Sequence, residues 1–149
     1  MTIEVEVQYA ADAEGLPAAA DFRRWVVAAL GEVADAELAV RVVDREESRR
    51  LNATYRGKDA PTNVLSFPAE LPEGIDLPLI GDIVICAPLV AREADEQHKT
   101  LADHWAHLTV HGVLHLLGHD HRTDEEAAAM EALETRILAG LGCADPWRI

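Results

Sequence analysis

Three of the four histidines in the segment HGVLHLLGHDH (residues 111–121) place tight limits on how this chain can fold. His111 and His115 are four residues apart, so on a helix they lie ~40° apart around the axis and about one turn apart along it. Gly118 allows the chain to turn out of that helix, and His121 can then supply a third nitrogen. We predict that the three imidazoles bind one metal ion.

The ligand types indicate what such an ion would do. Three neutral imidazoles leave Zn²⁺ with its full charge and an open position, where the pKa of a bound water falls to about 7. Structural zinc sites more often have four ligands and include thiolates, and Cys86 and Cys143 both lie outside the segment. A catalytic ion is therefore favoured. Two histidines at this spacing occur by chance fairly often, whereas three in this register with the intervening glycine are much less frequent by chance.

The spacing matches the zinc-protease motif H-E-x-x-H-x-x-G-x-x-H at every position except the second. The protease has its general-base glutamate there, whereas this chain has Gly112. We therefore expect zincin-like ligand geometry without proteolysis. His107 is expected either to orient His111 or to pack in the core, and His119 either to line the site or to face solvent. We expect His98 and His104 at the surface and Asp120 in the turn.

Hydrophobic periodicity supplies the rest of the fold. Alternating apolar and polar residues, or short apolar runs, predict strands over 2–9, 37–43, 62–67 and 80–86. Helical spacing and capping residues predict helices over 16–31, from 44 to about 55, from 88 to 117 with a break near 98–100, and from 123 onward. We expect one α+β domain over residues 1–149, with a small mixed sheet of about four strands packed with helices and a zincin-like metal-binding helix.

The net charge of the chain excludes general binding to nucleic acids or anionic membranes. Thirteen Lys and Arg oppose 27 Asp and Glu, a net charge of −14. A chain this acidic has no general affinity for DNA, RNA or anionic membranes, so a polyanion must be held by a local patch or a metal ion. We expect a narrow positive cleft on an acidic body.

The best candidate patch is residues 41–58, which carry six basic residues against three acidic ones. Ion pairs on a solvated helix, such as Glu46 with Arg50, explain several of the arginines at least as well as ligand binding does: Arg45, Arg49 and Arg50. Arg56 differs because it follows the predicted helix and precedes a strand. It is a candidate to bind a phosphate bidentately.

Nothing in the sequence indicates export or a membrane. The N-terminus, MTIEVEVQYA, lacks the basic and apolar regions of a signal peptide, and no apolar run approaches the ~18–20 residues that cross a bilayer. Two cysteines are too few for a disulfide scaffold, and Cys86 in an apolar run is expected in the core. We expect a cytoplasmic protein.

Three segments, in order, resemble the YbeY family of bacterial metal-dependent endoribonucleases: YRGKDAPTNVLSFP (55–68), GDIVIC (81–86) and HLTVHGVLHLLGHDH (107–121). His119 stands where an aromatic residue such as Tyr is expected, a departure that affects none of the ligands. The resemblance implies an α+β zincin-like fold and a hydrolase that cleaves single-stranded RNA. The implied roles are rRNA maturation, notably at the 3′ end of the small-subunit RNA, and ribosome quality control.

The resemblance also assigns residues and partners. It implies one zinc ion on His111, His115 and His121, with a catalytic or phosphate-binding role for Arg56. The implied partners are single-stranded RNA, the small ribosomal subunit and its assembly proteins, with no DNA. Two alternatives stay open: another zinc metallohydrolase with a peptide or small-molecule substrate, and a non-catalytic ribosome-associated factor with a structural metal. Gly112 counts against the first, and the lack of an evident general base supports the second.

Overall fold

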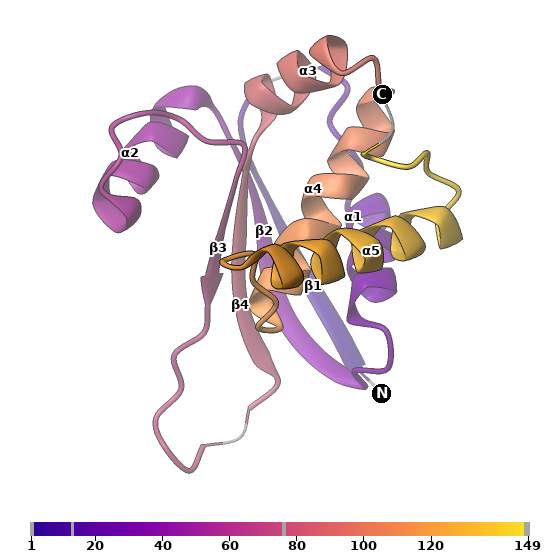
Figure 1. The fold of residues 1–149 in the computed structure, drawn as a ribbon. Coiled ribbons are helices and arrows are strands. Elements are labelled where there is room, and N and C mark those ends of the chain that lie inside the picture. The colour runs from indigo at the N-terminus through magenta and orange to yellow at the C-terminus, as the bar shows by residue number, and fades with distance from the viewer. Residues whose placement is uncertain (1, 13, 76, 148–149) are drawn as a thin grey trace.

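The structure is a computed structural model that describes residues 2–12, 14–75 and 77–147. Over these residues the chain forms four strands and five helices, and Figure 1 shows their arrangement. Their order is β1 (Thr2–Ala10), α1 (Ala19–Leu30), β2 (Asp35–Val43), α2 (Arg45–Arg56), β3 (Val64–Pro68), β4 (Leu79–Cys86), α3 (Ala87–Glu96), α4 (Leu101–Leu116) and α5 (Asp124–Gly140).

The strands form one mixed sheet in the order β1-β2-β4-β3. β1 and β2 pair in parallel, as do β2 and β4, with Val40 opposite Ile83. β3 lies at the edge and runs antiparallel to β4, with Leu65 opposite Val84. This arrangement confirms the α+β class and the mixed sheet of four strands.

One face of the sheet carries the main core. Helices α1, α4 and α5 lie on this side in Figure 1, and α4 contacts β3, β4 and the other two helices. Phe22, Trp25 and Trp105 pack edge to face beneath them, with ring centroids 5.5 and 5.7 Å apart. No helix in the described part of the chain is long and apolar enough to cross a membrane.

On the opposite face α2 covers one end of the sheet (Figure 1). A second, smaller apolar cluster lies beneath it and contains Val43, Leu65, Val84 and Cys86. Cys86 is buried in this cluster, as the sequence predicted. The remainder of this face is open.

Side-chain caps set several element boundaries. Asp44 accepts a hydrogen bond from the Glu47 backbone N–H at 2.9 Å and starts α2, as predicted. The helix expected from residue 16 begins instead at Ala19, where the Asp21 carboxylate accepts a hydrogen bond from the Ala18 N–H at 3.1 Å. The strand expected from residue 62 begins at Val64, because the Thr62 N–H donates to Ser48 Oγ rather than to a strand partner.

Candidate metal centre

The end of α4 brings the three histidines together. His111 and His115 lie on its last two turns, and the helix ends just after them. Gly118 has φ +98°, a conformation that side chains other than glycine rarely adopt, and the His119 N–H donates to the Leu114 carbonyl at 3.0 Å. The chain therefore folds back at once and places His121 beside the other two imidazoles.

The donor set fits a single transition-metal ion. One nitrogen from each of His111, His115 and His121 lies within 4.8 Å of the others, and the Nε2 atoms of His111 and His115 are 3.1 Å apart. Two nitrogens bound at 2.0–2.1 Å to one tetrahedral ion are themselves about 3.3 Å apart, so little adjustment is needed. Because His121 is exposed while the other two are half-buried, a bound ion would be open to solvent on one side.

A buried carboxylate supports this centre from behind. Glu134 lies on α5 with only 1% of its side chain exposed, and its Oε1 is hydrogen-bonded to His111 Nδ1. A histidine whose Nδ1 is held by a carboxylate presents its Nε2 to a metal, an arrangement common in zinc proteins. His107 faces the same carboxylate, with its Nε2 3.5 Å from Oε2.

The charge states suit metal binding. Burial alone would raise the pKa of Glu134, but the facing imidazoles of His107 and His111 outweigh it and lower that pKa to about 2. Glu134 is therefore an anion at neutral pH. Burial, aided by the neighbouring His111 and His121, lowers the pKa of His115. His115 is thus held in the neutral form that a metal requires.

The histidines open into a cleft of about 730 Å³ that also contains cationic side chains. Arg56, Lys58 and Arg122 line it. Arg56 is the last residue of α2, and its guanidinium donates to the Ser66 carbonyl on β3 at 3.2 Å. Arg122 pairs with Asp120 at 2.7 Å. Because Asp120 also lines the cleft, Arg56 and Lys58 supply the excess of positive charge beside the candidate metal centre, on a chain of net charge −14.

The packing of α4 explains the glycine at the position of the protease glutamate. A Cβ added at Gly112 would lie 2.9 Å from Ile83 Cγ2, and Ile83 is fully buried on β4. Any side chain at this position would force the buried Ile83 side chain to shift. The close packing of α4 on β4 therefore disfavours a glutamate here, and with it the peptidase alternative.

Several expectations about individual residues change. The prediction that His104 lies at the surface is wrong: it is 2% exposed, with Nε2 2.9 Å from Glu93 Oε1, because α4 is packed against neighbours on several sides. His98 is exposed, as expected. Glu46 pairs with Arg49 at 2.7 Å rather than with Arg50.

The structure also shows where the residues beside the candidate ligands lie. His107 is buried and faces Glu134. His119 is exposed and lines the cleft. Asp120 lies in the loop between α4 and α5, where its Oδ1 accepts a hydrogen bond from the His121 N–H at 2.7 Å.

Glu134 is the residue that the sequence analysis missed. A signal was present, since Glu134 is four residues after Met130 and four before Leu138, on the apolar side of the last helix. A charged residue at the spacing of a buried stripe predicts a buried, partnered charge. Its partner His111 is 23 residues away, which spacing alone does not reveal.

A three-histidine cluster at the end of a helix on a mixed sheet, open to a cationic cleft, defines a metal-binding α+β protein of hydrolase type. The family model described as Endoribonuclease YbeY matches residues 8–142. The chain belongs to the YbeY family.

Similar proteins agree with this assignment. A protein of Alkalilimnicola ehrlichii named Endoribonuclease YbeY is 65% identical over 99% of this chain and 92% of its own length. A protein of Stenotrophomonas maltophilia with the same name is 63% identical over 97% of this chain and 93% of its own length. The solution structure of TM1509 from Thermotoga maritima is 23% identical with a TM-score of 0.56, covering 96% of this chain and 99% of that one, and it supports the fold alone.

Proposed function

We propose that residues 1–149 work as one metal-dependent endoribonuclease domain that cleaves single-stranded RNA, and that it acts in the cytoplasm. The observation that carries this proposal is that the histidine triad and Arg56 line the same cleft. Membership of a family described as endoribonucleases gives the substrate class.

Different residues at the cleft have different roles in metal binding and phosphate binding. His111, His115 and His121 hold the metal, which we assign as zinc because neutral imidazoles suit it. When bound, this ion supplies a Lewis acid for the phosphodiester. Glu134 fixes the ring of His111 through Nδ1. Arg56 binds the phosphate and stabilises the negative charge that develops on it during cleavage, and Lys58 adds a second cation.

The biological setting follows from the family resemblance. We propose rRNA maturation, notably at the 3′ end of the small-subunit RNA, and ribosome quality control. The partners are then the small ribosomal subunit and its assembly proteins, with no role for DNA. A net charge of −14 supports such a setting, because weak general affinity for polyanions leaves specificity to the ribosome and to the site.

The test compares purified wild-type protein with His115→Ala on a single-stranded RNA, its duplex and the DNA of the same sequence. We expect the wild type alone to cut, and to cut only the single-stranded RNA. His98→Asn is the matched control, since His98 is exposed with φ +56°, which asparagine tolerates. Contaminating nuclease would act equally in all three proteins, so cleavage that the wild type and His98→Asn share and that His115→Ala lacks belongs to the protein itself. Cleavage by His115→Ala that equals the wild type and keeps a constant specific activity through further purification would remove the triad from the reaction.

Arg56→Glu separates the phosphate site from the metal site. We expect this variant to keep its metal content and to lose cleavage, because a carboxylate repels the phosphate that the guanidinium binds. Arg50→Glu makes the same charge change on an exposed residue of the same helix and is expected to retain activity. Unchanged turnover in Arg56→Glu would exclude Arg56 from the site.

A further inference from the structure

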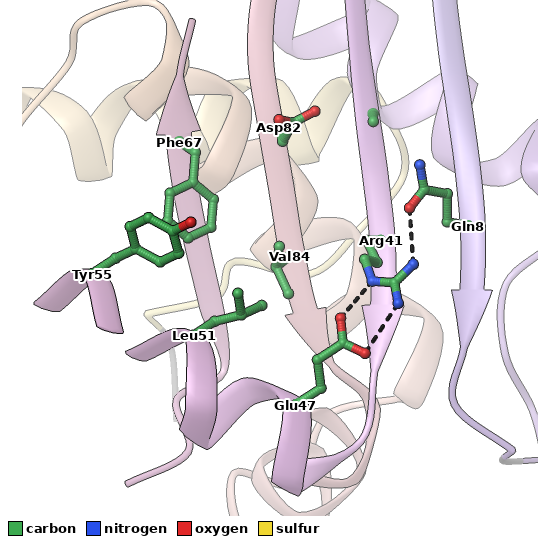
Figure 2. A pocket seen from close by; sticks show the side chains of 9 residues that line it. Gln8, Arg41, Glu47, Leu51, Tyr55, Phe67, Asp82 and Val84 are labelled. Atoms are coloured by element: carbon green, nitrogen blue, oxygen red, sulfur yellow. Dashed lines mark hydrogen bonds and ion pairs between the residues drawn. The ribbon is translucent and has the colours of Figure 1, made fainter. Parts of the chain in front are cut away.

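The open face of the sheet holds a second cavity on the other side of β3 from the histidine cleft. Its volume is about 440 Å³. Figure 2 shows the residues that line it, which come from α2 and the four strands. Its apolar wall includes Leu51 on α2 and Val84 on β4. The size lies within the range of small-ligand sites.

Two aromatic rings form one wall of this cavity. Tyr55 on α2 and Phe67 on β3 face each other, with ring centroids 5.1 Å apart and planes at 67° (Figure 2). Tyr55 is 64% exposed, more than Tyr9 and Trp147, which are each 48% exposed. Exposed aromatic rings are the groups on which unpaired nucleobases stack.

The polar groups of the cavity suit a neutral, flat ligand. The Arg41 guanidinium is fixed by Glu47 Oε1 at 3.1 Å and by Gln8 Oε1 at 3.0 Å. Asp82 adds a second carboxylate to the lining. With two carboxylates against one guanidinium the cavity repels a phosphate, whereas the Gln8 amide and the Asp82 carboxylate offer a donor and an acceptor to the edge of a base.

Only strand β3 lies between the cavity and the histidine cleft. β3 is the edge of the sheet, and successive side chains of a strand point to opposite faces. Ser66 accordingly lines the histidine cleft while Phe67 lines the cavity. The same division occurs on α2, where Arg56 lines the cleft and Tyr55 the cavity. In each of these two pairs of adjacent residues, one side chain lines the histidine cleft and the other lines the cavity.

We propose that Tyr55 and Phe67 form a stacking site for one unpaired nucleobase of the RNA whose cleaved phosphate lies in the histidine cleft. The strand would cross the edge at β3, where Arg56 bonds the Ser66 carbonyl, with its phosphates in the cationic cleft and one base in the cavity. This inference rests on the proposed function. It also accounts for a preference for single strands, because a paired base is not free to enter the cavity.

The test uses short RNAs made of 2′-O-methyl nucleotides, with the fluorescent base 2-aminopurine placed at successive positions. Wild-type protein is expected to quench the fluorescence strongly at one position only. Tyr55→Phe keeps the stacking face and should keep the quenching. Tyr55→Ala should lose it and bind the RNA roughly ten- to a hundredfold more weakly. An abasic nucleotide at that position should weaken wild-type binding equally and Tyr55→Ala binding no further.

Tyr9→Ala is the matched control, because Tyr9 is the other tyrosine of the chain, is 48% exposed and donates its hydroxyl to the Pro17 carbonyl at 2.7 Å. It should behave as wild type. Equal quenching and affinity in Tyr55→Ala would overturn the stacking site and leave the cavity to a protein partner. Cleavage of unmodified RNA is measured on the same samples. A wild type that cuts no RNA would refute the proposed function, whereas the quenching result separately decides the stacking site.

Discussion

The pairing of Glu134 with His111 is the contact at the residue scale whose removal most selectively tests the metal centre. In Glu134→Gln the amide is neutral and holds His111 Nδ1 less firmly. We expect zinc affinity to fall by about 10- to 100-fold, the usual effect of losing such a partner. Competition with a chromogenic chelator measures this directly on purified protein.

Glu131→Gln provides the control, because Glu131 is an exposed residue of the same helix. It should bind zinc as the wild type does. If Glu134→Gln also kept wild-type affinity while remaining folded, the carboxylate would have no part in holding the ligand.

The residues of this site differ in how far the sequence could predict them. His111, His115 and His121 are close in the chain, so helical geometry and one glycine were enough to group them. Glu134 and the buried position of His104 depend on how α3, α4 and α5 pack, which is set by contacts distant in sequence. Local spacing therefore predicted the candidate ligands but not the groups that support them.

At the scale of elements, the close approach of α4 to β4 should make Gly112 intolerant of substitution. Gly112→Ala places a methyl group 2.9 Å from Ile83 Cγ2. Overpacking costs about 1–3 kcal/mol, against a gain in helix propensity of up to about 1 kcal/mol. We expect a net loss of roughly 1–2 kcal/mol in the free energy of unfolding, measured by urea denaturation.

Gly140→Ala tests the same substitution where there is room. A Cβ at Gly140, at the end of α5, has no atom within 4 Å. It should leave stability unchanged or raise it by up to about 1 kcal/mol. Equal effects of the two substitutions would mean that α4 and β4 are not in close contact at Gly112.

The junction of α3 and α4 with the start of β3 should respond to acid. Glu93 faces His104 Nε2 at 2.9 Å, and its oxygens accept from Asn63 Nδ2 at 3.1 and 3.2 Å. Burial alone would raise the pKa of Glu93, but these hydrogen bonds outweigh it and lower that pKa. The stabilisation is therefore complete above the unfolded pKa of about 4.3 and is lost as pH falls through the folded pKa.

Glu93→Gln should accordingly flatten the fall in unfolding free energy below about pH 5. Urea denaturation at a series of pH values measures it, with Glu96→Gln as an exposed control on the same helix. Identical pH profiles for Glu93→Gln and the wild type would show that Glu93 contributes nothing to acid sensitivity.

The elements themselves were largely predictable, and their arrangement was not. Alternation predicted the strands, and Asp44 and Thr123 predicted the starts of α2 and α5, because both signals act within a few residues. The order β1-β2-β4-β3 depends on pairings across long connections, for which the sequence carries no local signal. The edge position of β3, which separates the two cavities, could be read only from the structure.

For the whole molecule, the distribution of charge limits how RNA is held. The segment 41–58 was expected to act as one basic patch, but the structure divides it between the two sides of β3. Arg41 pairs with Glu47 beside the second cavity, and only Arg56 and Lys58 of the segment line the histidine cleft. The cleft lining holds Arg56, Lys58 and Arg122 against Asp120, an excess of positive charge that agrees with the expected positive cleft on an acidic body but with fewer cations than the sequence suggested.

This small number of cations predicts a weak salt dependence. Each phosphate contact to single-stranded nucleic acid contributes about −0.7 to the slope of log affinity against log salt, so Arg56, Lys58 and Arg122 give roughly −2. Fluorescence anisotropy of a labelled RNA between about 50 and 200 mM salt measures the slope. A slope several times steeper would show that RNA is held by a wider basic surface.

The proposed function requires one metal ion at the histidine triad for RNA cleavage. The measurement is the activity of chelator-stripped protein on single-stranded RNA as zinc is added in fractions of an equivalent. We expect almost no cleavage without zinc, and a linear rise in activity that ends at one ion per chain. Full cleavage by protein verified to be free of metal, or a rise that His115→Ala reproduces, would contradict it.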